Sequence, residues 1–341
     1  MKIYHLSHTD LDGYGAQYIT NFYFKDVKFL NSNYGREIDD KFAQILSEID
    51  ASNDDKNVIL ITDLNLSLAQ CESFEEMIEG KNIKLFLLDH HQSGVECASA
   101  YSWYFLDSSR CATKITYDFF AGIFGKNKEL EIFSDVVNAV DIWLKDDKNF
   151  EMGKVCLGLV ANAKEINKVM FEAENNLYMD HLLKEASKFF NDKNDYIGLD
   201  MQVHAIKKSF FKEDKDDTLS NLISNYVVKK LSENKEKFSI SYKDHKGILT
   251  YNVGNVSVIG NDFLVANPEF DFFIDVTNKK TLSFRANGKL DVSAMAKHLV
   301  GGGGHVNASG GLFANFKDGF SYEPIKAQIV DLITKKTQEE I

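Results

Sequence analysis

The chain has 341 residues, of which 44% are hydrophobic and 26% charged, and it carries a formal net charge of -12. This length exceeds one ordinary compact core, so we expect two domains. The acidic balance argues against tight binding of long DNA or RNA, which needs a basic surface that neutralises phosphates, although it leaves room for a small local basic site.

Cysteine spacing and hydropathy exclude further classes of protein. The four cysteines are scattered without a C-x-x-C pair, which argues against a disulfide framework and against a zinc ribbon. The N-terminal run MKIYHLSH is typical of a strand and lacks the apolar region of a signal peptide. No apolar stretch approaches the ~18–20 residues that cross a bilayer. We therefore expect a soluble, cytoplasmic protein without a membrane partner, and the sequence leaves a homodimer open.

The first half of the chain alternates strand-like and helix-like segments. We expect strands at residues 2–6, 57–62 and 83–88, and helices at 14–24, 38–49, 68–78, 112–124 and 132–144. The continuous apolar runs NVILIT and IKLFLL are typical of strands that are buried on both faces. The alternation predicts an α/β domain with a parallel sheet, which we place at residues 1–190.

The second half of the chain has a different pattern of predicted elements. Residues 191–235 continue a charged, helical pattern that we interpret as a connector. Beyond them we expect strands at 239–242, 248–251, 256–259, 272–276 and 281–285, and a helix at 291–300 that Asp291 caps and Gly301 ends. These elements predict a second, smaller α/β domain at residues 236–341, with the active site in the cleft between the two domains.

Carboxylates and imidazoles follow three of the predicted strands. Because the carboxyl ends of parallel strands share one edge of a sheet, these side chains are expected to converge there. Oxygen and nitrogen donors at this density suit divalent metals, and paired ions typically hydrolyse phosphate esters. Residues 10–13 alone could be a turn, Asp63 alone a helix cap and Asp141 alone a surface acid, whereas two adjacent histidines after a buried strand are harder to explain in this way. Together the segments favour a two-metal site. The candidates are His8, Asp10 and Asp12; Asp63; Asp89, His90 and His91; and Asp141, from the apolar segment NAVDIWL.

A glycine run marks the second domain. Gly301–Gly304 fit neither a helix nor a strand, and glycine lets backbone N–H groups approach an anion closely. Arginine suits bidentate contact with phosphate, and arginines are rare in this chain. We therefore predict a phosphate-binding surface made of Arg285, Gly302, Gly303, Gly304, His305 and Ser309. Arg110 precedes a predicted helix whose N-terminus could also face a phosphate. Tyr14 and Trp143 are expected to pack in the core.

These motifs resemble those of the DHH phosphoesterase superfamily, which includes nano-RNases (oligoribonucleases) and RecJ-like phosphodiesterases. The stretch GGGGHVNASGG resembles the associated C-terminal DHHA1 domain. The resemblance implies two ions, usually Mn²⁺, with Mg²⁺ or Co²⁺ as alternatives. It assigns His8 and Asp10 to one ion, Asp12, His90 and Asp141 to the other, and Asp63 to both. It places His91 beside the scissile phosphate and makes Asp89 the acid that orients a histidine.

The leading hypothesis is a metal-dependent phosphodiesterase acting on small nucleotides. Candidate substrates are short oligoribonucleotides, dinucleotides of the pApA or pGpG type, cyclic dinucleotides and nucleoside bisphosphates. One alternative is a RecJ-like exonuclease on longer single strands, which the acidic charge disfavours. Another is a pyrophosphatase or phosphomonoesterase, which the glycine-rich domain disfavours. The alternative of another class is a non-catalytic nucleotide sensor, which would require a broken metal site.

Overall fold

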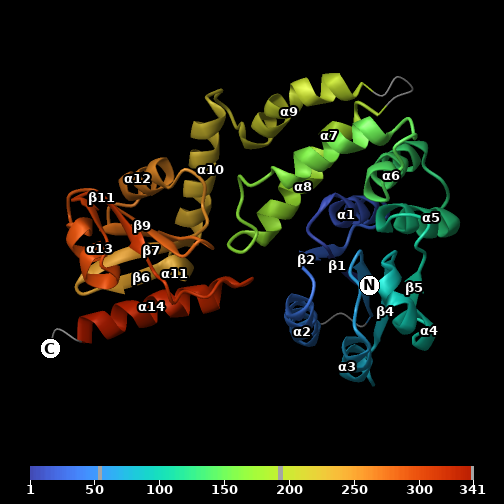
Figure 1. The fold of residues 1–341 in the computed structure, drawn as a ribbon, viewed down its shortest axis with the longest axis horizontal. Helices are drawn as coiled ribbons and strands as arrows, with labels where there is room; N and C mark the ends of the chain where they lie inside the picture. Colours follow the sequence, from blue (N-terminus) through green and yellow to red (C-terminus); the bar gives the residue numbers. More distant parts are fainter. Residues whose placement is uncertain (53–55, 191–194, 339–341) are drawn as a thin grey trace. The chain divides into compact units, whose positions relative to one another are not determined.

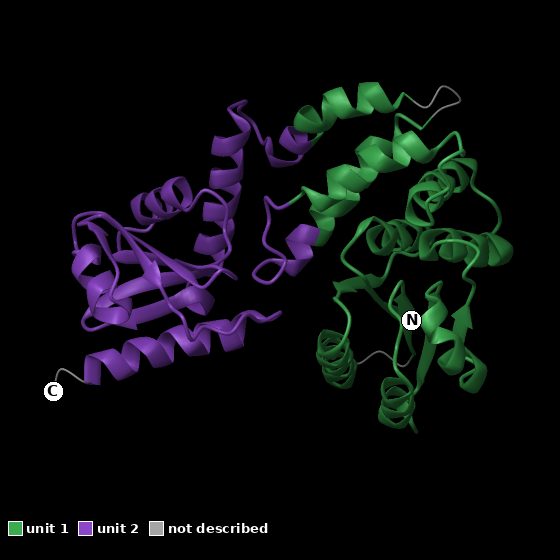
Figure 2. Ribbon diagram, viewed as in Figure 1, with its two compact units in different colours: residues 1–163, 176–206 green, residues 164–175, 207–341 purple. Residues whose placement is uncertain are grey.

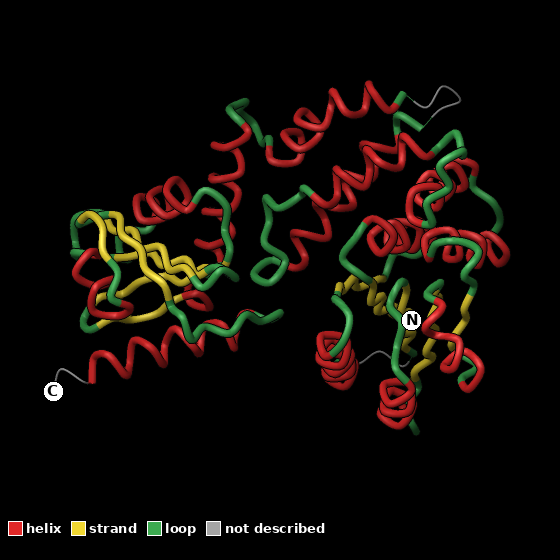
Figure 3. Tube along the Cα trace, in the orientation of Figure 1, coloured by secondary structure: helices red, strands yellow, loops and turns green. Residues whose placement is uncertain are grey.

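The computed structural model describes residues 1–52, 56–190 and 195–338. It divides into two compact units, one made of residues 1–163 and 176–206 and the other of residues 164–175 and 207–341 (Figure 2). The domain bounds expected from the sequence stay a prediction, and residues 191–194 of the expected connector lie outside the described residues. Each unit carries its own sheet (Figure 3).

Unit 1 is built on a five-stranded parallel sheet of order β2-β1-β3-β4-β5. The strands are β1 (Lys2–Ser7), β2 (Val27–Asn31), β3 (Asn57–Thr62), β4 (Ile83–Asp89) and β5 (Tyr104–Leu106). Register between neighbouring strands is regular, with Leu6 opposite Ile61 and Ile61 opposite Leu87. The expectation of a parallel sheet is confirmed, and its carboxyl edge is the edge at which the candidate ligands follow their strands.

Helices cover both faces of this sheet (Figure 1). On one face, α2 (Arg36–Ala51) and α3 (Leu68–Ile78) pack on β1, β3 and β4, and the rings of Phe42 and Phe74 stack 3.7 Å apart between the two helices. On the other face, α1 and α5 pack on each other and on the strands. Up to residue 211 the helices are α1 (Leu11–Tyr23), α2 (Arg36–Ala51), α3 (Leu68–Ile78), α4 (Val95–Ala100), α5 (Ala112–Phe124), α6 (Lys128–Asp141), α7 (Phe150–Ala161), α8 (Glu172–Ser187) and α9 (Tyr196–Phe211), with a short 3-10 turn at Gln92–Gly94.

Unit 2 carries a six-stranded mixed sheet of order β10-β11-β9-β8-β7-β6, in which β7 and β8 are parallel and the other pairs antiparallel. The strands are β6 (Ser239–Tyr242), β7 (His245–Tyr251), β8 (Phe272–Val276), β9 (Thr281–Ala286), β10 (Gly303–His305) and β11 (Ala308–Leu312). The helices are α10 (Leu219–Glu233), α11 (Lys235–Phe238), α12 (Val256–Ala266), α13 (Val292–Val300) and α14 (Tyr322–Gln338). The expected smaller α/β domain is confirmed as a fold.

Two sequence expectations for this unit are wrong. Residues 256–259 were expected to form a strand, but they begin the helix α12, where the apolar spacing of VSVIGNDFLVA places Ile259 and Phe263 in the core. The glycine run was expected to be neither helix nor strand, but Gly303 and Gly304 belong to β10 and pair with β11. Gly301 does end α13, in the left-handed conformation that favours glycine.

Among the residues that the structure describes, no helix is both long and apolar enough to cross a membrane.

Candidate metal and phosphate site

The turn after β1 brings the first two candidate ligands together. Asp10 caps α1, because its carboxylate accepts a hydrogen bond from the Gly13 N–H at 3.0 Å. His8 Nδ1 hydrogen-bonds to the other oxygen of Asp10 at 2.8 Å. Burial works to raise the pKa of Asp10, but the hydrogen bond and charge of His8 outweigh it and lower the pKa to about 2. A Cβ on Gly13 would lie 2.3 Å from the backbone oxygen of His8, so this turn requires glycine.

Asp12 is held by a helix that is distant in sequence. It lies in the first turn of α1 and is 1% exposed. Its two carboxylate oxygens accept hydrogen bonds from the N–H groups of Ala112 and Thr113, both at 2.7 Å, and the Thr113 hydroxyl donates to the Asp12 carbonyl. These N–H groups form the start of α5, where the helix dipole favours a negative charge. The orientation of Asp12 is therefore fixed by the fold.

Asp63 is the buried centre of the candidate site. It follows β3 in a left-handed conformation, with φ 55°, which is uncommon for a residue other than glycine. It is 2% exposed, and its Oδ2 atom accepts no hydrogen bond from the residues that the structure describes. Burial, together with the charges of Asp12 and Asp10, raises its pKa well above the usual range. A cation bound beside this carboxylate would stabilise its charged form.

His90 joins the acids from three different elements. Its Nε2 atom lies 3.4 Å from Asp63 Oδ1, 3.6 Å from Asp141 Oδ2 and 3.7 Å from Asp12 Oδ2. Asp141 is the last residue of α6, and burial followed by the charges of Asp12 and Asp10 raises its pKa to about 8. The convergence expected at the carboxyl edge of the sheet therefore exists, and it includes the acid from the helical segment.

His91 points to a different set of partners. Its Nδ1 hydrogen-bonds to Asp89 Oδ1 at 2.7 Å, and the buried Tyr104 hydroxyl donates to Asp89 Oδ2 at 2.8 Å. The hydrogen bond that His91 donates to the Asp89 carboxylate raises the pKa of His91. On the other side, His91 Nε2 lies 3.0 Å from the hydroxyl of Tyr34. Asp89 thus orients a histidine, as the resemblance implies, and the histidine is His91.

Tyr34 is a residue that sequence reasoning missed. It follows β2, a strand that was not expected, although the run VKFLN followed by the turn residues SNYG is a signal for a strand that ends at the same edge. The ring of Tyr34 lies 4.7 Å from that of His8 and 5.6 Å from that of His91, measured between centroids. Burial and the nearby carboxylate of Asp63 raise its pKa.

The donor atoms fall into groups that could each hold a metal ion. Within each group one ligand atom from every residue lies within 4.8 Å of the others, and the groups are His8, Asp10 and Asp63; Asp63, His90 and His91; and Asp12, Cys111 and Asp141. Carboxylate and imidazole donors suit Mn²⁺, Co²⁺ or Mg²⁺. The unpartnered buried oxygen of Asp63 fits a cation as well, so the residues present agree with a metal centre.

In unit 2, sheet register brings two of the predicted phosphate-binding residues into line. Ala308 in β11 lies opposite both Arg285 in β9 and His305 in β10. At the usual strand spacing this places the two residues about 10 Å apart on one face. Arg285 donates to the Ser257 hydroxyl at 2.8 Å, at the start of α12, while His305 is exposed.

The glycines beside His305 allow a close hairpin. A Cβ on Gly302 would lie 2.2 Å from the Gly310 oxygen, and one on Gly304 would lie 2.6 Å from the Ala308 oxygen, whereas Gly303 has open space among the described residues. Ser309 is 8% exposed, and its hydroxyl donates to the Val292 carbonyl at 2.6 Å. That hydroxyl is used to hold the hairpin on α13, and its role toward a substrate stays a prediction.

Arg110 and Trp143 differ from what the sequence suggested. The guanidinium of Arg110 pairs with the carboxylates of Asp107 and Asp118, so its charge is already neutralised beside the start of α5. Tyr14 packs in the core as expected, but Trp143 does not: it is 55% exposed and has a φ of 58°. The helix α6 ends at Asp141, three residues earlier than expected, and this leaves the indole outside the core.

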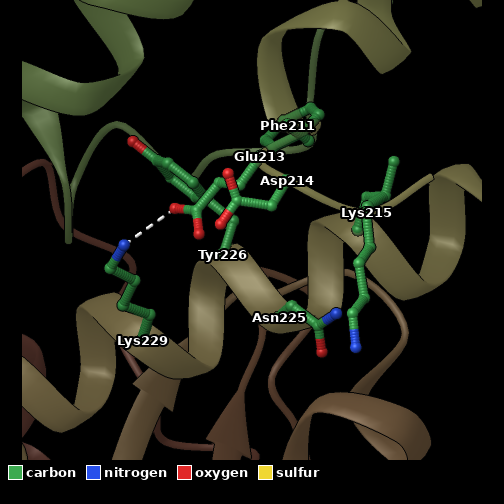
Figure 4. A pocket seen from close by; sticks show the side chains of 8 residues that line it. Phe211, Glu213, Asp214, Lys215, Asn225, Tyr226 and Lys229 are labelled. Atoms are coloured by element: carbon green, nitrogen blue, oxygen red, sulfur yellow. Dashed lines mark hydrogen bonds and ion pairs between the residues drawn. The ribbon is translucent and has the colours of Figure 1, made fainter. Parts of the chain in front are cut away.

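A separate cavity of about 270 Å³ lies in unit 2 (Figure 4). Phe211 and Tyr226 form its apolar wall, and Lys229 pairs with Glu213 at 2.7 Å at its mouth. None of the predicted site residues is among the described residues that line it. The cavity therefore adds nothing to the chemistry of the acidic centre.

Comparisons with known proteins give the class and the family. No protein-family model matches the chain. A curated protein from Helicobacter pylori (strain ATCC 700392 / 26695), named 3',5'-cyclic-nucleotide phosphodiesterase, is 41% identical over 343 residues, which cover 97% of this chain and 99% of the relative. The crystal structure of an uncharacterized protein from Helicobacter pylori G27 is 40% identical, with a TM-score of 0.92 over 98% of this chain and 99% of that one.

A pGpG-specific phosphodiesterase from Vibrio cholerae also aligns, over 99% of both chains, but at 13% identity and a TM-score of 0.26, which supports no inference about this protein. The fold, the acidic centre and the curated relative together define the protein as an enzyme, a hydrolase of the phosphodiesterase class. It belongs to the family of the Helicobacter pylori 3',5'-cyclic-nucleotide phosphodiesterase.

Proposed function

We propose that the protein is a DHH-type phosphodiesterase that uses two divalent metal ions to hydrolyse small nucleotides. The observation that carries the proposal is the position of Asp63. One of its oxygens lies 3.7 Å from His8 and the other 3.4 Å from His90, and the first accepts no hydrogen bond from any described residue. A carboxylate placed between two donor groups is the bridge that a two-metal site needs.

The two ions would be held on either side of this bridge. The resemblance to DHH enzymes assigns the ions, usually Mn²⁺, and the donor groups are compatible with that assignment. Bound there, the ions would lower the pKa of water toward neutrality and neutralise charge on the phosphoryl oxygens. The first ion would take His8 and Asp10, the second Asp12, His90 and Asp141, and Asp63 would contact both.

The chain's own residues would fix the geometry of the reaction. The start of α5 holds Asp12 through two backbone N–H groups, so this ligand cannot rotate away. Asp89 holds His91 Nδ1, which fixes the ring with Nε2 directed away from the core. In unit 2, Arg285 and His305 would bind the phosphate or terminal nucleotide of the substrate, with the β10 backbone close to it.

The substrates we propose are small nucleotides with few phosphate groups. The relative at 41% identity is named for 3',5'-cyclic nucleotides, which makes these the first candidates. Linear dinucleotides such as pApA and pGpG, cyclic dinucleotides and short oligoribonucleotides also contain phosphodiester bonds, whereas a nucleoside bisphosphate would be hydrolysed at a phosphomonoester. The net charge of -12 opposes binding of a long polyanion and is tolerable for a small one.

A product profile tests the proposal. Purified protein with Mn²⁺ is expected to hydrolyse a 3',5'-cyclic nucleotide or a linear dinucleotide, and bis(4-nitrophenyl) phosphate as a generic diester, and to stop when the metal is chelated. Asp63→Ala is expected to abolish hydrolysis while the protein stays folded. Hydrolysis that continues in Asp63→Ala would remove the metal assignment, and the absence of activity on the whole panel with every metal would remove the function.

A further inference from the structure

A line of four hydrogen-bonded side chains leads out of the core of unit 1. The Tyr104 hydroxyl donates to Asp89 Oδ2 at 2.8 Å, Asp89 Oδ1 binds His91 Nδ1 at 2.7 Å, and His91 Nε2 lies 3.0 Å from the Tyr34 hydroxyl. Such a line fixes the two inner members, Asp89 and His91, because each of them is held from both sides.

Exposure rises along this line. Asp89 is fully buried, the side chain of His91 is 30% exposed, and Tyr34 is 44% exposed. The outermost polar group is therefore the hydroxyl of Tyr34. His91 already uses both of its ring nitrogens, one for Asp89 and one for Tyr34, so it has no free nitrogen with which to contact a phosphate in this arrangement.

The loop that carries Tyr34 is anchored at the two residues before the tyrosine. The Ser32 N–H donates to the Ser7 carbonyl at 2.9 Å, which ties the loop to the end of β1. The backbone N–H of Asn33 donates to Glu37 in α2 at 3.1 Å. The ring of Tyr34 also packs 4.7 Å from that of His8. These contacts hold the hydroxyl between a proposed metal ligand and the histidine.

We propose that the Tyr34 hydroxyl is the side-chain donor that contacts a phosphoryl oxygen of the substrate, and that His91 acts through it as a positioning residue. This inference rests on the proposed function. The Asp89 carboxylate accepts from Nδ1–H of His91, and in the doubly protonated ring Nε2–H donates to the Tyr34 hydroxyl, which then keeps its own hydrogen to donate to a phosphoryl oxygen. In this arrangement Tyr34 takes the place beside the phosphate that the resemblance assigns to His91, and His91 holds Tyr34 there.

Tyr34→Phe tests the inference, because phenylalanine keeps the ring beside His8 and removes only the hydroxyl. With bis(4-nitrophenyl) phosphate and Mn²⁺, kcat is expected to fall by about 10²–10³, the usual cost of one donor to a developing oxyanion. KM should change by less than about threefold, since the contact strengthens in the transition state. Tyr196→Phe, at an exposed tyrosine at the start of α9, is the matched control and should retain full activity.

A double variant separates a catalytic role for Tyr34 from a structural one. If His91 acts through Tyr34, Tyr34→Phe combined with His91→Phe should be no slower than the slower single variant, because residues that act as a unit are not additive. A kcat of Tyr34→Phe within about threefold of wild type, or above it, would overturn the inference; so would multiplying losses in the double variant.

A spectroscopic readout keeps this test distinct from the proposed function. In ¹⁵N-labelled protein, Tyr34→Phe is expected to shift the His91 Nε2 resonance, and Tyr196→Phe is not. An unchanged resonance would show that Tyr34 and His91 are not hydrogen-bonded in solution. That result would overturn the inference whatever the activity of the variant. If the wild-type protein hydrolyses no diester at all, both the proposed function and the catalytic role of Tyr34 are wrong. If the wild-type protein is active and Tyr34→Phe is equally active, only the inference about Tyr34 is wrong.

Discussion

The sharpest test of the acidic centre is Asp63→Asn, because the substitution should change stability in opposite directions with and without metal. In metal-free protein the buried carboxylate has one oxygen without a partner among the described residues and lies near Asp12 and Asp10. Asparagine keeps the shape and removes the charge. A buried charge near other carboxylates costs more than a buried neutral amide, so Asp63→Asn should be more stable than wild type, by about 1–3 kcal/mol.

Metal should reverse this order. A ligand that binds only the folded state adds RT ln(1 + [L]/Kd), which is about 2.7 kcal/mol at one hundred times Kd. Wild type should gain this stabilisation with Mn²⁺, whereas Asp63→Asn loses the charge that attracts the ions and should gain little. For a domain of 150–250 residues, 1 kcal/mol corresponds to about 2–4 °C in melting temperature. Asp63→Asn should therefore melt above wild type under chelator and below it with Mn²⁺, and the difference between the two melting temperatures should change by several degrees.

Differential scanning calorimetry with chelator and with Mn²⁺ measures the effect. Asp275→Asn is the matched control, since Asp275 is a fully buried acid in β8 with an Oδ2 atom that lacks a partner among the described residues, far in sequence from the candidate ligands. It should keep the wild-type gain on adding Mn²⁺. The reasoning is refuted if Asp63→Asn is less stable than wild type under chelator, or if it responds to Mn²⁺ as strongly as wild type does.

Three further predictions concern the fold and unit 2. Gly13→Ala should destabilise the protein by about 2–4 kcal/mol in urea unfolding, because the new Cβ would lie 2.3 Å from the backbone oxygen of His8. The control Gly122→Ala lies in α5, where a Cβ would have nothing within 4 Å among the described residues, and it should stabilise the protein by roughly 0.5–1 kcal/mol. Burial raises the pKa of Asp275 to about 7, so its folded form holds a proton more tightly than the unfolded form. The contribution of Asp275 to the free energy of unfolding should be fully present below about pH 4 and should fall by up to about 4 kcal/mol as the pH rises toward 7. Asp275→Asn should make the free energy of unfolding depend less on pH over this range. His305→Ala should raise KM for nucleotides by roughly tenfold, the effect of losing one hydrogen bond to a charged group, without changing the Mn²⁺ response of the melting curve; an unchanged KM would remove His305 from the substrate site.

Much of unit 1 could be predicted from sequence because its strands are buried on both faces. The runs that became β3 and β4 are continuous and apolar, and their expected bounds agree with the structure to within one residue. Parallel pairing then fixes which ends meet, so residues that are far apart in the chain could be placed at one edge. The acids and histidines that follow these strands do meet there, as the contacts of His90 with Asp12, Asp63 and Asp141 establish.

What the sequence did not predict depends on contacts between distant segments. β2 is short and only partly buried, so its pattern was weak, and Tyr34 was missed together with it. The hydrogen bonds from the start of α5 to the Asp12 carboxylate join residues about one hundred positions apart, so no local sequence pattern could predict them. The pairing of β10 with β11 relies on glycines whose β-propensity is low, so propensity pointed away from a strand. Trp143 was misplaced because helix periodicity does not say where a helix ends.

Hydrogen bonding in the acidic centre indicates where positive charge is needed. Asp10 is compensated by the turn after β1, Asp12 by two N–H groups of α5, and Asp89 by a histidine and a tyrosine. Asp63 and Asp141 have no comparable donors among the described residues, and these are the two acids whose pKa is raised. A negatively charged nucleotide entering this centre would add to the repulsion that already raises those pKa values. Divalent cations beside these two acids would offset that repulsion, and this is the physical reason we propose for a metal requirement at this site.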